Sequence, residues 1–150
     1  MRIAVNTRLL IKNKLDGMGW FCCETMKIIT RNHPEHEFIF IFDRNYDKDF
    51  IFSENITPKI VRPVTRHPVL WYIWLEWVLP FKLKKWKADI FVSPDGFLSL
   101  RSGIPAIPVI HDINFLHRPK DLPFTTRIYY NYFFPEFARK ATRIGTVSEY

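Results

Sequence analysis

The apolar run at residues 37–43, EFIFIFD, decides the fold. A strand with one face in water alternates apolar and polar side chains, whereas this run of Phe and Ile leaves no polar face. It therefore predicts a strand that is covered on both faces, which is typical of a parallel sheet with helices on either side.

Outward from this run, strand-length apolar stretches alternate with longer helical patterns in both directions along the chain. Strands are predicted at residues 2–6, 37–43, 59–62, 88–92, 104–111 and 143–147, and helices at 17–32, 69–86 and 127–140. Pro80 is predicted to break or kink the second helix. This order indicates βαβ units, so we expect an α/β fold, a Rossmann-like parallel sheet flanked by helices.

The composition is that of one globular domain of 150 residues with a formal charge of +7. Basic residues concentrate in residues 1–31 and 59–89, which favours phosphates, nucleic acid or an anionic membrane as partners. No recognised RNA- or DNA-binding motif occurs, so nucleic acid is not an expected partner. Adjacent Cys22 and Cys23 suit neither a disulfide nor a metal site. Without a signal-peptide core or a long apolar run, we expect a cytoplasmic protein, soluble or peripheral on the inner membrane face.

Ligands of an open parallel sheet bind outside the carboxyl ends of its strands, which directs attention to the loops that follow them. Gly17, Met18 and Gly19 open a predicted helix whose free amides suit a phosphate, although two glycines there also fit an ordinary turn. The three-glycine dinucleotide fingerprint is absent, which disfavours a nicotinamide enzyme.

His111 and Asp112 end an apolar strand, where they fit either a capping pair or groups that bind a substrate hydroxyl. Ser93, Pro94 and Asp95 follow the preceding strand. A serine hydrolase built from Ser93, His111 and Asp112 is disfavoured, because the Gly-x-Ser-x-Gly nucleophile elbow is missing.

The segment from Trp71 to Trp86 mixes aromatic residues with lysines. The helical spacing of its apolar residues favours a helix packed on the sheet. The same mixture of aromatic and cationic residues also occurs in segments that lie on membrane surfaces, so both interpretations stay open.

Taken in order, these motifs resemble the N-terminal half of a group 1 glycosyltransferase of family 4, a retaining, nucleotide-sugar-dependent enzyme of the two-domain GT-B architecture. The resemblance spans the whole chain and rests on five segments. They are Asn6-Thr7-Arg8, Gly17-Met18-Gly19-Trp20-Phe21, Ala88-Asp89-Ile90-Phe91-Val92-Ser93-Pro94, His111-Asp112-Ile113-Asn114-Phe115 and Thr146-Val147-Ser148-Glu149-Tyr150. Asn6 stands where many relatives have Asp, and Trp20 where many have Arg.

The resemblance implies specific roles for these residues. His111 and Asp112 would be catalytic, with His111 beside the transferred sugar, while Gly17, Met18 and Gly19 would contact the donor diphosphate. The acceptor side would be formed by Arg8, Trp20, Ser93, Pro94 and Asp95. Ser148 and Glu149 would lie at the cleft or hinge.

The resemblance also implies a C-terminal donor-binding domain that is absent from this chain, so residues 1–150 would bind a glycan or lipid-linked glycan acceptor and be inactive alone. Such enzymes are assigned a front-face substitution, so neither a metal nor a cofactor is expected. Cell-surface polysaccharide or glycan synthesis would be the setting. The alternative is a non-catalytic Rossmann-like module that docks on a membrane or a protein.

Overall fold

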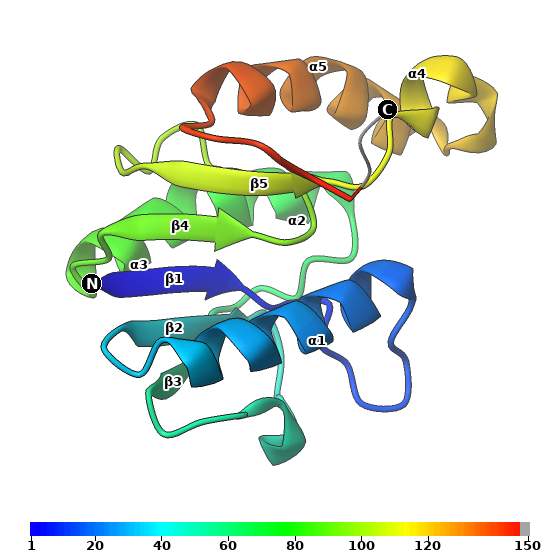
Figure 1. The fold of residues 1–150 in the computed structure, drawn as a ribbon. Helices are drawn as coiled ribbons and strands as arrows, with labels where there is room; N and C mark the ends of the chain where they lie inside the picture. Colours follow the sequence, from blue (N-terminus) through cyan, green and yellow to red (C-terminus); the bar gives the residue numbers. More distant parts are fainter. Residues whose placement is uncertain (148–150) are drawn as a thin grey trace.

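The computed structural model describes residues 1–147, apart from the side chain of Pro119, and shows a single parallel sheet (Figure 1). Six strands lie in the order β3-β2-β1-β4-β5-β6, and each neighbouring pair is parallel. They are β1 (Arg2–Asn6), β2 (Glu37–Phe42), β3 (Ile56–Ile60), β4 (Ile90–Ser93), β5 (Ala106–Ile110) and β6 (Gly145–Thr146). The prediction of an α/β, Rossmann-like parallel sheet is therefore confirmed.

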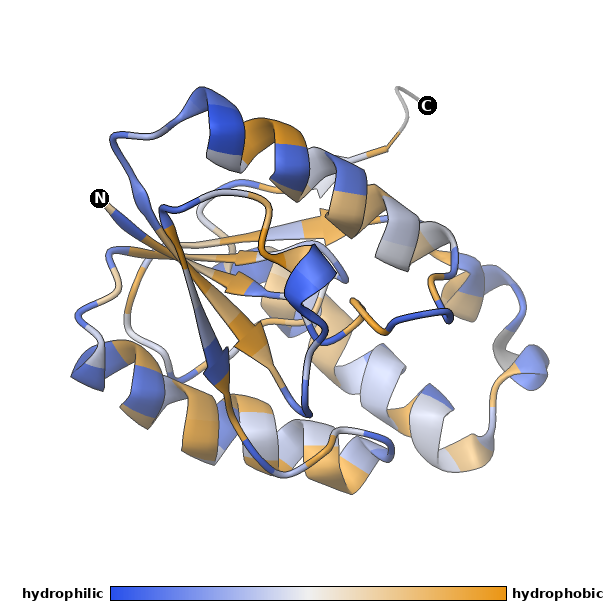
Figure 2. Cartoon of the chain, turned by 90° about the horizontal axis from the view of Figure 1, so that it is seen from below, coloured by the Kyte–Doolittle hydropathy of each residue, from blue (hydrophilic) through white to orange (hydrophobic). Residues whose placement is uncertain are grey.

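Helices cover both faces of this sheet. The α-helices are α1 (Gly17–Asn32), α2 (Pro68–Ile73), α3 (Leu79–Lys85), α4 (Asn114–His117) and α5 (Phe124–Lys140). A π-helical turn, Trp74–Val78, joins α2 to α3, and short 3-10 helices form at Lys48–Phe50 and Pro119–Asp121. Figure 2 shows the predominantly hydrophobic strands between the helical layers.

The apolar run of β2 serves both faces, as its composition predicts. Phe38 and Phe40 belong to the core on the α1 side, together with Cys22 and Met26. The alternate residue Ile39 belongs to the other core, which the helices from α2 to α5 cover. Because successive strand side chains point to opposite faces, only a strand between two helical layers can be apolar throughout.

Four predicted strands are corrected at their boundaries. The strand predicted at residues 88–92 is β4, Ile90–Ser93, and the one predicted at residues 143–147 is β6, Gly145–Thr146. The strand predicted at residues 59–62 is β3, Ile56–Ile60, which begins earlier and contains Pro58. Since β3 is an edge strand, its proline needs no ladder partner on the open side. The strand predicted at residues 104–111 is shorter, because β5 ends at Ile110 and leaves His111 in the loop.

Pro80 does not end the helical run of residues 68–85. In the preceding π-helical turn the Leu79 amide donates to the Trp74 carbonyl, and Pro80 stands in the first turn of α3, where a proline ring is tolerated. Trp74 and Leu75 of this run are fully buried, which confirms core packing for its inner side. Trp77 and Phe81 stay exposed.

Candidate functional site

The carboxyl ends of β1, β4 and β5 bring three of the predicted loops together. Two adjoining hollows, of about 250 and 180 Å³, open at this edge and share Met18, Asp95 and Tyr130 in their walls. His111 and Asp112 line the larger hollow, and Arg8 lines the smaller. We call the two hollows together the carboxyl-edge cleft.

A tight turn after β4 aims one carboxylate back into the sheet edge. The amide of Gly96 donates to the Ser93 carbonyl at 3.1 Å, and Gly96 has a φ of +83°, which a residue with a side chain rarely adopts. The Asp95 side chain is thereby turned toward β1, and it is only 2% exposed. Its Oδ1 accepts from Ser93 Oγ at 2.8 Å and from Asn6 Nδ2 at 2.9 Å.

Arg8 neutralises this buried carboxylate. Its Nε donates to Asp95 Oδ2 at 2.6 Å, and both side chains are almost fully buried. The guanidinium also lies 4.1 Å from the centre of the Phe97 ring, a cation–π contact. Arg8 and Asp95, two of the five residues predicted for the acceptor side, are therefore bonded to each other in the cleft, with little surface left for a ligand.

The buried network continues from Arg8 to the end of β2. Arg8 Nη1 donates to Thr65 Oγ1 at 3.3 Å, and that hydroxyl donates to Asp43 Oδ2 at 2.7 Å. Burial of Asp43 disfavours its charged form, but hydrogen bonds from Arg44 and Thr65 outweigh this and hold the pKa of Asp43 below its ordinary value. The carboxyl ends of three strands are thus linked by one network of hydrogen bonds.

Ser93 is a structural residue in this arrangement. Its side chain is fully buried, and its hydroxyl donates to Asp95. His111 bonds the Pro94 carbonyl instead, and Asp112 Oδ1 accepts from the Asn114 amide at 2.8 Å. The serine-hydrolase arrangement that the sequence disfavoured is therefore not assembled.

His111 is the half-buried imidazole of the cleft. Its Nε2 lies 2.6 Å from the Pro94 carbonyl oxygen, and because a carbonyl only accepts, this contact assigns the proton to Nε2. The ring meets Phe21 of α1 edge-on, with centroids 4.9 Å apart. In the neutral ring Nδ1 then carries a lone pair, and it bonds no group within residues 1–147. It can accept a hydrogen bond from a ligand hydroxyl.

The first turn of α1 forms the neighbouring wall. Asp16 caps the helix, and its Oδ1 accepts from the Gly19 amide at 2.8 Å, so that amide is already occupied. A Cβ at Gly19 would lie 3.2 Å from the Leu9 carbonyl oxygen, whereas a Cβ at Gly17 would meet nothing within 4 Å. The predicted phosphate contact therefore depends on the amides of Gly17 and Met18, and of these two residues only Met18 lines the cleft.

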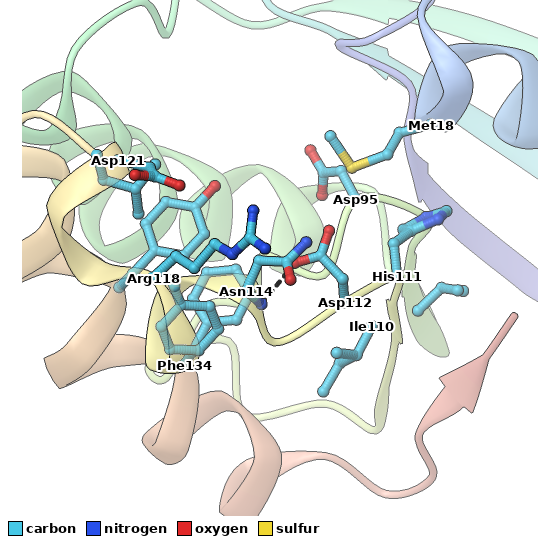
Figure 3. A pocket seen from close by; sticks show the side chains of 13 residues that line it. Met18, Asp95, Ile110, His111, Asp112, Asn114, Arg118, Asp121 and Phe134 are labelled. Atoms are coloured by element: carbon cyan, nitrogen blue, oxygen red, sulfur yellow. Dashed lines mark hydrogen bonds between the residues drawn. The ribbon is translucent and has the colours of Figure 1, made fainter. Parts of the chain in front are cut away.

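Asn114 and Arg118 are cleft residues that the sequence reasoning missed. Figure 3 shows their side chains beside Asp112, in the segment that follows β5. The only available signal was their place in the loop after residue 111. Burial raises the pKa of Tyr130 on α5, the effect of Arg8 being smaller and opposite, so its hydroxyl stays protonated in the cleft.

The remaining predicted residues are less central. Trp20 is 55% exposed on α1 and does not line either hollow. The predicted cleft or hinge residues Ser148 and Glu149 lie outside the described residues.

One group of potential metal ligands occurs in the described part of the chain, away from the cleft. His33, Glu35 and His36 place ligand atoms within 4.8 Å of one another. This group follows the end of α1 and precedes β2, so it lies at the amino edge of the sheet, opposite the cleft. A metal bound there would not contact a cleft ligand.

No family model matches the sequence, and no curated protein matches it significantly. The functional assignment therefore rests on the cleft itself and on the residue pattern described above.

Proposed function

We propose that this chain is the acceptor-side domain of a retaining, nucleotide-sugar-dependent glycosyltransferase. The observation that carries the proposal is the position of His111, which presents an unbonded ring nitrogen in the cleft while its ring contacts the helix that opens with Gly17. One wall thus suits a sugar hydroxyl and the next suits a phosphate.

The proposed chemistry uses these groups for binding and orientation. Nδ1 of His111 accepts from a hydroxyl of the transferred sugar, and the amides of Gly17 and Met18 donate to the donor diphosphate. The bond between the anomeric carbon and the phosphate oxygen breaks, and the acceptor oxygen bonds that carbon on the same face. The acceptor proton passes to the departing phosphate, so no side chain of this domain becomes covalently attached.

Asp112 and Arg118 are assigned to the acceptor. Both are exposed and line the larger hollow, so a carboxylate and a guanidinium are available to a polyhydroxyl ligand. Asp95 and Arg8 are positioning residues, because they are bonded to each other beneath the cleft. The second domain of such an enzyme would hold the nucleotide, and a cytoplasmic location stays part of the proposal.

The test begins with the coding DNA beyond the codon for Tyr150 and continues with the complete gene product. Release of nucleoside diphosphate is measured with a panel of nucleotide sugars and glycan acceptors. We expect His111→Ala to lower turnover about a hundredfold or more. The control is His33→Ala, which removes an exposed imidazole at the opposite sheet edge. Near-wild-type turnover by His111→Ala, or no turnover by the unaltered protein with any donor, contradicts the proposal.

The second candidate function is a non-catalytic docking module. It is favoured by one observation, the exposed apolar surface over α2 and α5. Two results together would favour the module over the enzyme: a reading frame that ends at Tyr150 in the native gene, and a chain that binds no sugar nucleotide.

A further inference from the structure

The helical run from α2 to α3 is apolar on two opposite sides. Its inner side enters the core, where Trp74, Leu79 and Leu83 are fully buried. Its outer side is also apolar, although a helix on a sheet normally turns polar residues outward. The exposed apolar residues of this run are Val69 (58%), Tyr72 (40%), Ile73 (38%), Trp77 (58%) and Phe81 (66%).

Helix α5 adds a second exposed apolar stripe. Phe124, Ile128 and Tyr132 recur every four residues and are 66%, 53% and 66% exposed. The two stripes meet in a groove of about 370 Å³ between α2 and α5, where the rings of Tyr72 and Phe133 lie 5.8 Å apart. We call the exposed residues of both stripes the aromatic face.

Nothing within residues 1–147 covers the aromatic face. Isolated exposed apolar residues are ordinary, but eight on adjoining helices form a patch of the kind that marks an interaction surface. Part of the high aromatic content of the chain, 17%, lies on this face. Trp and Tyr side chains favour the boundary between water and lipid, because each combines an apolar ring with a polar group.

Cations lie at both ends of the α2-to-α3 part of the aromatic face. Lys84 and Lys85 are exposed at the end of α3, Arg66 is exposed before α2, and the Arg101 guanidinium lies 4.2 Å from the centre of the Trp77 ring. Between residues 62 and 87 the only acidic residue is Glu76.

Glu76 does not offset this charge at the surface. Its side chain is buried, and Oε1 accepts from the Leu100 amide at 2.9 Å. Burial raises the pKa of Glu76, and the smaller effects of Leu100 and Arg101 oppose that shift. The outer surface of this run is therefore aromatic and cationic, without an exposed carboxylate.

We propose that the aromatic face docks on an anionic lipid membrane, with its aromatic side chains in the interfacial region and Lys84, Lys85 and Arg66 at the lipid phosphates. Charge complementarity selects this occupant, because an apolar patch bordered by cations matches a bilayer interface with anionic headgroups. No helix within residues 1–147 is long and apolar enough to span a membrane, so the contact is peripheral in this part of the chain.

This docking would bring the carboxyl-edge cleft near the bilayer. Trp71 of α2 lines the smaller hollow, and its ring lies 5.3 Å from that of Tyr129, which lines the groove of the aromatic face. The cleft and the face are thus separated by one layer of rings. The docking inference does not require sugar transfer, so it stands or fails independently of the proposed function.

The experiment measures cosedimentation of the 150-residue chain with vesicles of phosphatidylcholine, with and without phosphatidylglycerol. We expect binding to the anionic vesicles that weakens as salt rises, because screening shortens the reach of the lysine charges. Trp77→Ser should weaken binding about tenfold or more, and Phe81→Ser provides a second test of the same face. Lys84→Gln with Lys85→Gln should weaken it about thirtyfold.

Matched controls separate the aromatic face from the rest of the surface. Ile28 on α1 is 58% exposed, as is Trp77, so Ile28→Ser removes an equally exposed apolar side chain from the opposite helical layer. Lys14→Gln with Lys48→Gln removes the same charge as the α3 pair. Both controls should retain wild-type binding, and the circular dichroism of all variants should match that of the wild type.

Three results would overturn the inference. The first is failure to bind anionic vesicles at low salt. The second is equal loss of binding in the face variants and their controls. The third is a wild-type dimer by light scattering that Trp77→Ser converts to a monomer without vesicle binding, because a second copy of the chain would then cover the face.

Discussion

Replacement of Asp95 by asparagine should be among the most destabilising conservative changes in this protein. Every group that bonds the carboxylate is a donor: Ser93 Oγ, Asn6 Nδ2 and the Phe97 amide at Oδ1, and Arg8 Nε at Oδ2. Either orientation of the new side-chain amide therefore sets an N–H against a donor. The Arg8 guanidinium, with its side chain 6% exposed, also loses its counter-charge.

The expected loss is about 3–5 kcal/mol of unfolding free energy, because removal of one partner leaves a buried charge uncompensated. This is a large share of the roughly 5–15 kcal/mol available to a domain. Urea unfolding followed by tryptophan fluorescence measures it. With a slope of about 2 kcal/mol per M, the midpoint should fall by about 2 M.

The matched control is Glu37→Gln, which makes the same change in an exposed pair. Arg2 Nε lies 2.8 Å from Glu37 Oε2, with side chains 46% and 43% exposed, so the expected loss is within about 1 kcal/mol. Arg8→Met combined with Asp95→Asn should lose less than the sum of the two single changes. A loss for Asp95→Asn no greater than that of the control would refute the assignment of a buried ionic floor.

Further predictions concern local packing, pH and thiol chemistry. Gly19→Ala should cost about 1–3 kcal/mol by thermal unfolding, because its Cβ would crowd a backbone carbonyl, whereas Gly17→Ala should be neutral or slightly stabilising. The pKa of Asp43 is lowered in the folded state, so its carboxylate stabilises the fold above its unfolded pKa. This stabilisation is lost as pH falls through the folded pKa, so Asp43→Asn should make the free energy of unfolding depend less on pH in the acid range. Burial raises the pKa of both Cys22 and Cys23, so neither thiol should react with Ellman's reagent at mildly alkaline pH until urea unfolds the chain. Rapid labelling of the native protein would contradict that expectation.

Local patterns predicted the sheet and its helices well where one periodicity dominated. Helix α1 and strand β1 have the predicted bounds, because each has a distinct apolar pattern and a clear beginning or end. The edge strand β3 was placed too late, since Pro58 obscured its first residues. The π-helical turn before Pro80 had no recognisable sequence signal.

The candidate site was predicted only in part. The sequence directed attention to the loops after the strands, and the structure places His111 and Asp112 from one of these loops in the cleft. Asp95 lines the same hollow, but its bonds to Arg8, Ser93 and Asn6 could not be read from the sequence. All three are polar residues after strands, and a linear pattern does not distinguish a buried bonded side chain from one that faces a ligand.

The sequence by itself determined the layered α/β architecture, because strand and helix periodicities are local properties that a window of residues reveals. Only the tertiary structure decided which polar residues are scaffold and which are free to bind. Arg8 and Asp95 are 87 residues apart in the chain, and a charge can be buried only where the fold supplies its partner. The aromatic face could likewise be recognised only in the tertiary structure, because the exposed side of α2 and of α5 depends on which side of each helix packs on the sheet.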